Sequence, residues 1–279
     1  MKLVLPRQRE LNLERCKLMA ILNITPDSFS DGGKFVGVDA ALRQVASMLA
    51  DGADIIDVGG ESTRPGAIQV PLQQELDRVL PVIELIRREF DTVISVDTYK
   101  ATVMTEAIAA GADIINDIKA LQEQGALAAA AKLQVPVCLM HMQGQPDSMQ
   151  QAPQYRDVIT EVSQFLQARI RACVDAGIAP SQLILDPGFG FGKTMTHNYQ
   201  LLARLGELGS SGLPVLAGMS RKSMIGQLLN RNTSERLAGS IACATIAVMH
   251  GARIIRAHDV RETADAIAVA QATFFGEQV

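Results

Sequence analysis

Eight short apolar runs recur along this chain of 279 residues, and they constrain its fold more than any other feature. The runs are rich in β-branched residues, and the segments between them carry apolar residues every three or four positions. Strands that are apolar on both faces are typical of a parallel sheet, and the intervening period is that of amphipathic helices. The runs occupy residues 18–23, 54–59, 92–97, 113–116, 135–140, 182–186, 214–219 and 252–257.

Three of these runs lie in strings that share one pattern, which indicates weak internal repetition. In DGADIIDVGG (51–60), AGADIINDIK (110–119) and HGARIIRAHD (250–259), a glycine suited to a helix end precedes a short apolar strand. Eight such strand and helix units are the content of a closed (β/α)8 barrel, or TIM barrel. A doubly wound open sheet is the alternative, but no dinucleotide fingerprint supports it. We therefore expect an α/β protein with one barrel domain over residues 1–279, of which 1–16 form an N-terminal extension.

Helices are predicted between the runs, at about 38–49, 72–86 and 155–175, from their periodic apolar residues. The second of them carries Pro81 in its interior, where proline removes a backbone hydrogen bond. This helix is predicted either to kink at Pro81 or to begin later than its periodicity suggests.

Composition and charge exclude several classes of function. A formal net charge of −4 offers no basic surface for nucleic acid. No uninterrupted apolar stretch reaches the length of about 18 residues that a membrane span needs. The N-terminal MKLVLPRQRELNLERCK lacks the apolar segment of an export signal, so a cytoplasmic protein with no membrane partner is expected. The cysteines are far apart and are predicted to be reduced core thiols, at Cys16, Cys138, Cys173 and Cys243.

The string LILDPGFGFGKT (183–194) resembles a phosphate-binding P-loop but does not fit one. That motif needs four residues between its two glycines, and here only three separate Gly188 from Gly192. The position that would restore the spacing is Pro187, which has no N–H group to donate. The string is better interpreted as a strand that delivers Asp186 to its carboxyl end and then opens into a glycine-rich loop.

Polar side chains follow every predicted strand, at the end where a barrel builds its site. Caps of the following helices are the alternative explanation for pairs such as Asp97–Thr98 or Asn116–Asp117. Capping does not explain why Arg64, Lys222 and Arg256 reach the same rim of an acidic protein. The strand-end residues are Asn23, Glu61, Thr63, Arg64, Asp97, Asn116, Asp117, Met140, His141, Asp186, Ser220, Arg221, Lys222, Arg256 and His258.

The types of these residues indicate what the site holds. Carboxylates and an amide at Asp97, Asn116 and Asp186 suit the edge of a flat heterocycle rich in N–H and C=O groups. Arginine, histidine and asparagine at other strand ends suit the oxygens of a phosphate or diphosphate. The loops 23–35 and 59–67 are long and polar, and they are either mobile lids over the site or ordinary surface loops.

Eight motifs, in order, resemble those of the bacterial dihydropteroate synthase family, and the resemblance covers the chain from about residue 17 onward. Tyr99 and Lys119 are less usual in that family but lie beside the functional positions. The motifs are LNITPDSFSDGG (22–33), GGESTRPGA (59–67), SVDT (95–98), GADIINDI (111–118), LMHMQGQPDSMQ (139–150), LDPGFGFGK (185–193), GMSRKS (218–223) and RAHDV (256–260).

The resemblance implies a TIM barrel, usually a homodimer, that uses Mg²⁺ in folate biosynthesis. Such an enzyme condenses 6-hydroxymethyl-7,8-dihydropterin diphosphate with p-aminobenzoate, releases diphosphate and is inhibited by sulfonamides. The catalytic residues implied are Asp97, Asp186, Arg256 and His258. Those implied for the pterin are Asp97, Asn116, Met140, Asp186, Gly218, Lys222 and Arg256. Those implied for diphosphate are Asn23, Arg64, Arg256 and His258, with Asn23 acting through the metal. Those implied for p-aminobenzoate are Thr63, Pro65, Phe191 and Ser220.

A mechanism is expected in which diphosphate leaves before the arylamine attacks, with Asp97 and Asp186 stabilising the cation on the ring. Lys193, at the end of the glycine-rich loop, is expected to be solvated. Two alternatives share the ring-binding pattern. One is a pterin-binding methyltransferase barrel, which would not need the pair Arg256 and His258, and the other is a pterin-binding relative without catalysis.

Overall fold

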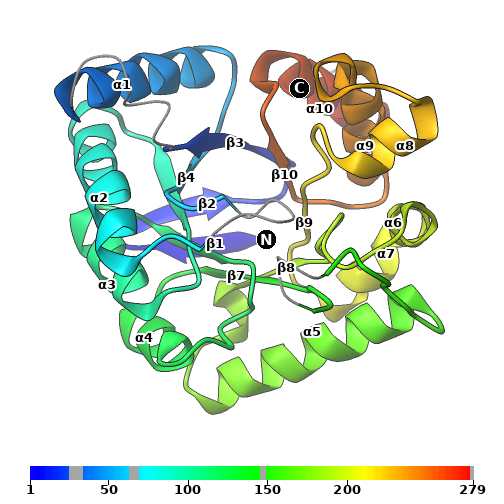
Figure 1. The fold of residues 1–279 in the computed structure, drawn as a ribbon, viewed down its shortest axis with the longest axis horizontal. Coiled ribbons are helices and arrows are strands. Elements are labelled where there is room, and N and C mark those ends of the chain that lie inside the picture. Colours follow the sequence, from blue (N-terminus) through cyan, green and yellow to red (C-terminus); the bar gives the residue numbers. More distant parts are fainter. Residues whose placement is uncertain (25–33, 63–68, 145–148, 277–279) are drawn as a thin grey trace.

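The computed structural model describes residues 1–24, 34–62, 69–144 and 149–276, and it contains a ring of eight parallel strands surrounded by helices (Figure 1). The order of neighbours in the sheet is β8-β7-β6-β5-β4-β3-β10-β9. The predicted (β/α)8 barrel is therefore confirmed, and each predicted apolar run overlaps one strand. The strands are β3 (Lys17–Asn23), β4 (Ile55–Gly59), β5 (Val93–Asp97), β6 (Ile114–Asp117), β7 (Val137–Met140), β8 (Leu183–Asp186), β9 (Leu216–Ala217) and β10 (Ile254–Ala257).

The ring is most weakly joined between β8 and β9. Strand β9 has only two residues, far fewer than the run predicted at 214–219. Pro214 at the start of that run has no N–H group for a ladder, and its carbonyl accepts from Leu185 N at 2.9 Å. In the described residues the two strands are connected by one isolated parallel bridge between Leu185 and Val215.

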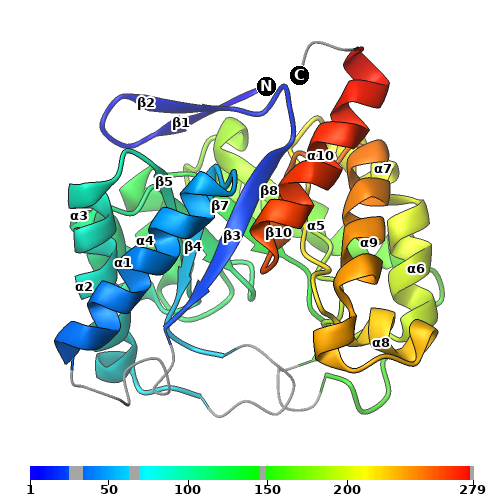
Figure 2. The same ribbon diagram turned by 90° about the horizontal axis from the view of Figure 1, so that it is seen from above.

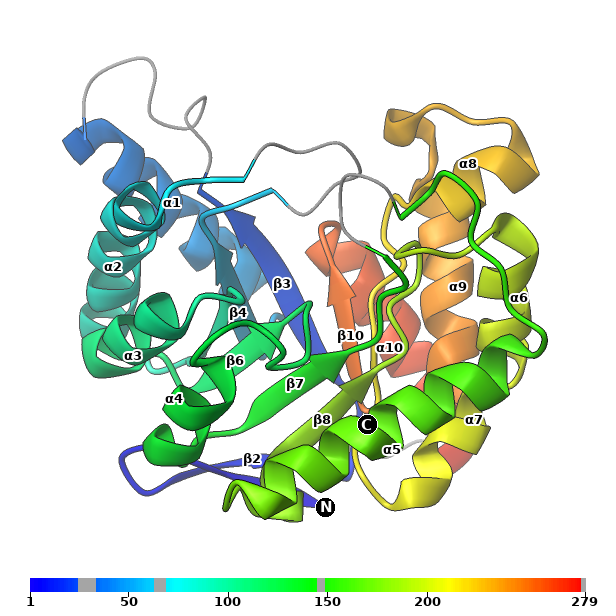
Figure 3. The same cartoon turned by 60° about the horizontal axis from the view of Figure 1, so that its bottom comes forward.

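The helices cover the outside of the ring (Figure 3). The helix-ending glycines of the three repeated strings have positive φ angles, 101° at Gly52, 127° at Gly111 and 91° at Gly251, as the repeat predicts. The helices are α1 (Lys34–Ala50), α2 (Leu72–Glu89), α3 (Ala101–Ala110), α4 (Ala126–Leu133), α5 (Val158–Asp175), α6 (Met195–Ala203), α7 (Leu205–Leu208), α8 (Ser223–Leu229), α9 (Leu237–Met249) and α10 (Val260–Phe275), with short 3₁₀ turns η2 (Pro180–Gln182), η3 (Gly209–Ser211) and η4 (Thr233–Glu235).

Helix α2 begins at Leu72 and continues through Pro81 to Glu89, so the alternative of a later start is wrong. An interior proline costs a helix about 3 kcal/mol. Val82 and Ile83, on the buried face of α2, are fully buried against the barrel. Since each such side chain stabilises the fold by about 1.5–3 kcal/mol, tertiary packing outweighs the local penalty.

A hairpin of β1 (Lys2–Leu5) and β2 (Arg9–Asn12), which the sequence analysis treated only as an extension, covers the N-terminal end of the barrel (Figure 2). Four hairpin leucines pack into one cluster with one side chain from each barrel strand. This apolar layer closes that end of the barrel. The cluster is Leu3, Leu5, Leu11, Leu13, Met19, Ile55, Val93, Ile114, Cys138, Ile184, Leu216 and Ile254.

A buried carboxylate fixes the hairpin to the barrel. Asp113 is completely buried and accepts from Arg7 at 2.6 Å, from Arg9 at 3.1 Å and from Arg87, while the backbone N–H of Ile94 donates to it at 2.9 Å. Both of its oxygens are therefore satisfied by charged donors, which is the condition for a stable buried charge.

All four cysteines are buried and free, as predicted. Within residues 1–24, 34–62, 69–144 and 149–276, no helix has the length and apolar character needed to cross a membrane.

Candidate active site

The candidate site is the next layer of inward-facing side chains, two residues beyond the apolar layer on each strand. Because side chains alternate along a strand, residues two apart point to the same side. Where the first layer is apolar, this layer is largely polar, and it lies near the C-terminal end of the barrel. Its members are Ile21, Asp57, Ser95, Asn116, Met140, Asp186, Gly218 and Arg256.

Arg256 on β10 connects two carboxylates across the barrel. Its Nε donates to Asp57 Oδ2 at 2.6 Å, and its Nη2 donates to Asp97 Oδ2 at 2.7 Å. Asp57 is fully buried, and Asp97 is 7% exposed. One guanidinium is thus shared by two buried acids, so the group carries an excess of negative charge.

The excess negative charge affects the pKa of Asp97, the last residue of strand β5. Burial raises the pKa of Asp97 to about 7; Arg256 opposes the shift, while the neighbouring charges of Asp57 and Glu75 add to it. Its Oδ1 atom is buried and has no hydrogen-bond partner among the described residues. Asp57 Oδ1 and Ser95 Oγ are in the same condition, and Asp57 pairs with Ser95 in the register of β4 and β5. Buried polar atoms of this kind are costly unless a ligand satisfies them.

Asn116 lies opposite Asp97 in the register of β5 and β6 and is 4% exposed. Its Nδ2 donates to Asp57 Oδ2 at 3.1 Å, which assigns the orientation of the amide and leaves its carbonyl oxygen as an acceptor. Its neighbour Asp117 behaves as the capping alternative predicts, because both of its oxygens accept backbone N–H groups, from Lys119 at 2.7 Å and from Leu121 at 2.8 Å. Only Asn116 of this pair faces the site.

Asp186 and Lys222 approach from the strands on either side of the weak junction. Asp186 is 7% exposed and accepts from Gly188 N at 2.7 Å. Burial raises its pKa, and Lys222 opposes the shift. Burial lowers the pKa of Lys222 to about 8, and Asp186 opposes that shift. The ammonium of Lys222 donates to the carbonyl of Phe189 and lies 4.6 Å from the centre of the Phe191 ring.

Apolar groups line the remainder of the site. Met140, at the end of β7 and opposite Asp186, packs in a cluster with Tyr99 and Ile118, and Phe191 packs against that cluster. Gly218 lies beside Arg256, whose Cβ would be 3.5 Å from a side chain at that position. A flat molecule could therefore lie between apolar surfaces and reach polar atoms at its edge.

Ser220 and His258 are in contact at the rim. The backbone N–H of His258 donates to Ser220 Oγ at 3.2 Å, and His258 Nδ1 lies 3.1 Å from the same oxygen. Asn23 is exposed at the end of β3, and its Oδ1 faces Gly59 next to Asp97. Thr63, Arg64 and Pro65 lie outside the described residues, as do most of the loops 23–35 and 59–67 proposed as lids.

The described part of the site thus brings together a shared arginine, three carboxylates, an amide, a lysine and a serine–histidine pair. Residues 19–258 match the family of pterin-binding enzymes. The chain is 56% identical over 268 residues to the dihydropteroate synthase of Escherichia coli strain K12, which covers 96% of this chain and 95% of that protein.

The chain belongs to the dihydropteroate synthase family.

Solved structures of dihydropteroate synthases agree. The Yersinia pestis enzyme in a sulfonamide complex has a TM-score of 0.93 and 58% identity, covering 98% of this chain and 99% of that one. The Xanthomonas albilineans enzyme with 4-aminobenzoic acid has a TM-score of 0.91 and 50% identity, covering 98% and 97%. The membership confirms the family read from the motifs and the enzyme class, a transferase.

One expectation for this dihydropteroate synthase family member is wrong. Lys193, expected to be solvated, is only 3% exposed. Its Nζ lies 2.9 Å from His141 Nδ1 and donates to the carbonyls of Gly188 at 2.9 Å and Phe191 at 3.0 Å. A lysine at the end of a polar loop is usually exposed, but here the loop folds back over the side chain and supplies its acceptors.

The sequence reasoning also missed residues. Asp57 and Ser95 lie two residues before the ends of their strands, and only the strand ends were searched. Counting inward in steps of two from Asp97 or Gly59 would have found them. Hydrogen bonds from neighbouring side chains also hold the start of the 59–67 loop. Glu61 accepts from Tyr99 Oη at 2.7 Å and from Lys100 Nζ at 2.6 Å. Tyr99 also accepts from Gln69 at 2.9 Å, so the less usual residue beside Asp97 connects Glu61 and Gln69.

Proposed function

We propose that this chain condenses 6-hydroxymethyl-7,8-dihydropterin diphosphate with p-aminobenzoate to form 7,8-dihydropteroate and diphosphate. The observation that carries the proposal is the set of buried acceptors around Arg256, in which Asp97 Oδ1 and Asp57 Oδ1 have no partner among the described residues. A pterin ring presents N–H groups along one edge and could satisfy such atoms. The relatives that have this name, and their complexes with a sulfonamide and 4-aminobenzoic acid, support the same reading.

The ring is proposed to lie between Arg256 and the apolar cluster at Met140. Asn116, Asp97, Asp186 and Lys222 would then meet its polar edge. Arg256 Nη1 makes no hydrogen bond within the described residues, so it remains free to contact the ligand. Because Asp57 and Asp97 hold the other side of the guanidinium, Arg256 is oriented before substrate arrives, which reduces the entropic cost of binding.

The chemistry follows from the excess negative charge. In the proposed first step the bond between the methylene carbon and the diphosphate oxygen breaks, and its electron pair leaves with diphosphate. The dihydropterin ring delocalises the positive charge that remains, and the carboxylates of Asp97 and Asp186 stabilise it electrostatically. The nitrogen of p-aminobenzoate then forms the new bond to carbon and releases its proton to water. No nucleophilic serine or cysteine is required.

The leaving group and the second substrate would occupy the rim. His258 and Arg256 are positioned for diphosphate oxygens, with Arg64 proposed as a further contact from the resemblance. Ser220 would hold the carboxylate of p-aminobenzoate, beside Phe191 and the ammonium of Lys222. Thr63 and Pro65 complete this pocket by the resemblance alone. The contact between Ser220 and His258 would connect the two binding regions.

The residues fit a Mg²⁺ ion that is held mainly by substrate. Magnesium prefers oxygen ligands and often binds through one or two protein groups together with phosphate oxygens and water. Asn23 presents an amide oxygen beside Asp97, and the described residues contain no group of three or more metal-ligating side chains. We propose that Asn23 contributes one ligand. When bound, the ion would neutralise charge on diphosphate.

The test is release of diphosphate by the purified protein from dihydropterin diphosphate in the presence of Mg²⁺, with and without p-aminobenzoate. Formation of 7,8-dihydropteroate with stoichiometric diphosphate is expected. Binding of the pterin diphosphate without its turnover would instead indicate a non-catalytic relative. Transfer of a methyl group to a corrinoid protein would indicate the methyltransferase alternative.

Three further properties are proposed with this function. Sulfonamides should compete with p-aminobenzoate, since they carry the same arylamine. Assembly as a homodimer is proposed from the resemblance, and a cytoplasmic location is proposed on the same ground. Sedimentation and competition kinetics would test the first two.

A further inference from the structure

The buried lysine at the end of the glycine-rich loop has no role in the proposed reaction, although it lies next to the site. Lys193 is 3% exposed, and the three closest contacts of Nζ are His141 Nδ1 and the carbonyl oxygens of Gly188 and Phe191. A fourth contact, to the carbonyl oxygen of His141, is longer at 3.4 Å, and burial lowers the pKa of Lys193 well below its ordinary value. Lys193 forms no salt bridge within the described part of the chain. Its acceptors are backbone and imidazole atoms of two neighbouring loops.

His141 is held in the form that this arrangement needs. Burial, together with the neighbouring Lys193, lowers the pKa of His141 to about 2. The imidazole is therefore neutral, and its Nδ1 lies within hydrogen-bond distance of Lys193 Nζ, at 2.9 Å. Its ring packs edge-on against Phe165, with the ring centres 4.9 Å apart, so its position is fixed by α5. Lys193 is thereby anchored to an element outside its own loop.

The loop that Lys193 terminates has little freedom to settle elsewhere. Gly188 and Gly192 have φ angles of 68° and 63°. A Cβ on Gly188 would lie 1.9 Å from the carbonyl oxygen of His141, and one on Gly192 would lie 2.3 Å from that of Gln143. The backbone of the loop after β8 therefore lies directly on the loop after β7. Lys193 donates to both loops, to Gly188 and Phe191 in one and to His141 in the other.

Phe191 lies between these fixed points. Its carbonyl accepts from Lys193 at 3.0 Å, and its ring packs against the cluster of Met140, Tyr99 and Ile118 beneath the ammonium of Lys222. The bond from Lys193 thus orients the backbone of the residue whose side chain forms one wall of the site.

We infer that Lys193 is a positioning residue for the second substrate: by holding the carbonyls of Gly188 and Phe191 against His141, it places the Phe191 ring where p-aminobenzoate binds. This inference rests on the proposed function. Asp186, in contrast, is held by β8 and by Gly188 N, and the pterin edge also meets Asn116 and Lys222. Loss of Lys193 should therefore affect the second substrate far more than the first.

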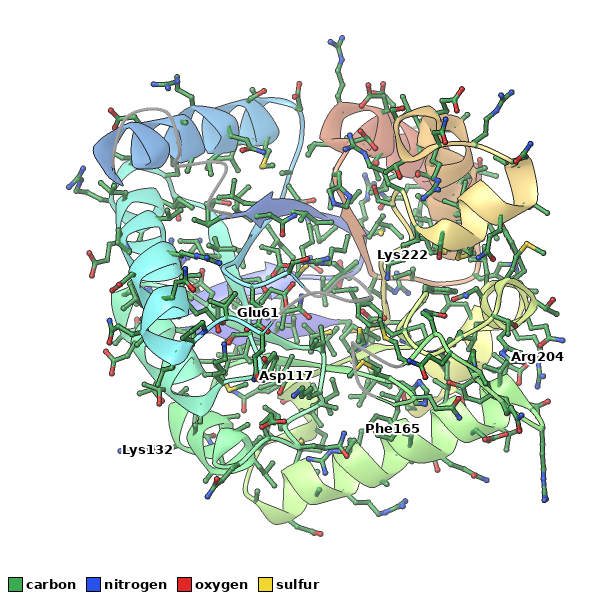
Figure 4. The ribbon with its side chains drawn as sticks, viewed as in Figure 1. Glu61, Asp117, Lys132, Phe165, Arg204 and Lys222 are labelled. Carbon is green, nitrogen blue, oxygen red and sulfur yellow. The ribbon has the colours of Figure 1, made fainter. Side chains whose placement is uncertain are left out.

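The test compares Lys193→Met with Lys132→Met, a lysine that points away from the barrel on α4 (Figure 4). Methionine keeps the length of the stem but cannot donate. We expect the KM for p-aminobenzoate to rise about tenfold in Lys193→Met, as for a pocket wall misplaced by a fraction of an ångström. The kcat and the Kd for a pterin ligand, measured by calorimetry, should stay within about threefold of wild type, and Lys132→Met should change nothing.

A double-mutant cycle with Phe191→Leu separates positioning from a general structural effect. If Lys193 acts through the Phe191 ring, Lys193→Met should add little to the KM of the Phe191→Leu protein. Additive effects in the cycle, or an equal loss of pterin affinity, would overturn the inference.

A second variant covers the case in which Lys193→Met does not fold. Lys193→Gln keeps an N–H donor for one carbonyl and should show a KM between those of wild type and the Phe191→Leu protein. A wild-type KM in a folded Lys193→Gln protein would overturn the inference. Failure of the inference is distinguishable from failure of the proposed function, because only the latter abolishes dihydropteroate formation by the wild-type chain.

Discussion

The two ends of the barrel each bury an aspartate, but they treat it in opposite ways. At the N-terminal end Asp113 is surrounded by three arginines and a backbone N–H, so every oxygen is satisfied. At the C-terminal end Asp97 shares a single arginine with Asp57, and one oxygen of each acid has no partner in the described residues. The same side chain is thus a structural anchor at one end and an unfinished binding group at the other.

The comparison indicates that the N-terminal end of the barrel contributes stability and that the C-terminal end provides the groups for binding and chemistry. The hairpin, its leucines and Asp113 close one end with no unmet polar group among those side chains. The opposite end retains uncompensated charge in a buried layer, which is unfavourable for folding but available to a ligand. Barrel enzymes divide their two faces in this manner, and the effects of three changes are expected to differ between the two ends.

The largest effect is expected from Asp113→Ala. Removing one partner of a buried ionic group typically costs about 3–5 kcal/mol, because the remaining charges are left without compensation. We expect a loss of that size in the free energy of unfolding, measured by urea denaturation. The kcat/KM of the folded protein should be unchanged.

A matched control is Glu10→Gln in the same hairpin. Glu10 pairs with Lys2 at 2.8 Å, but both side chains are more than half exposed. Exposed pairs contribute little, so this variant should unfold at the wild-type urea concentration. A large drop in activity for Asp113→Ala, with stability intact, would contradict the division between the two ends.

The next effect is expected from Asp97→Asn at the other end. Asparagine keeps the size of the side chain and its bond to Arg256 but removes the charge that is proposed to stabilise the cation. Loss of one such electrostatic contribution costs about 10²–10³ in kcat. Steady-state assay of diphosphate release measures it, and a variant with more than a tenth of wild-type kcat would show that the charge is dispensable. Stability should not fall.

The smallest effect is expected in how the stability of the Asp97→Asn protein depends on pH. The pKa of Asp97 is raised to about 7 in the folded protein, above the ordinary value of 3.8. Below about pH 4 both states bind the proton, whereas between about pH 4 and 7 only the folded state does. Asp97 therefore makes the wild type progressively less stable as the pH rises through this window, and the full cost remains above pH 7. Asp97→Asn should gain stability relative to wild type between pH 4.5 and 7.5.

Urea midpoints of both proteins, measured side by side, test this point. Asp117 and His141 also titrate with shifted pKa values, but they do so in both proteins. The difference between the two curves therefore reports Asp97 together with the groups whose pKa its charge shifts, such as Lys222. A difference that is constant with pH would mean that Asp97 is ionised in the folded protein throughout, as Asp–Arg pairing alone would predict.

The barrel could be predicted from the sequence because its signal is local. Strands such as β4 and β5 are buried along their whole length, so their residues are mostly apolar and do not alternate between apolar and polar. The hairpin could not be predicted in the same way. Its turn places Arg7 and Gln8 at φ angles of 60° and 59°, where asparagine or glycine is expected. The bonds from Arg7 to Asp113 and to the carbonyl of Gly111 hold this turn, and both partners are more than 100 residues away in the chain.

The site was predicted as far as it lies at the ends of strands. Asp97, Asn116, Asp186 and Arg256 were found because each stands at or beside the end of a predicted strand. Asp57 was not predicted, because a single acid within an apolar strand has no evident role until the inward-facing positions of the strand are counted. Lys193 was misjudged for a different reason. Two of its contacts are backbone carbonyl oxygens, and the direction of a backbone carbonyl cannot be predicted from residue types.

The short strand β9 has one more consequence. Asp186 ends β8, Lys222 follows β9, and in the described residues the two strands are joined by one bridge between Leu185 and Val215. A molecule that contacts both side chains would lie across this junction and connect the two strands in addition to their one bridge. Substrate would then tighten the barrel itself, and the amide of Leu185, bonded to Pro214, would exchange with heavy water more slowly in the loaded enzyme than in the empty one.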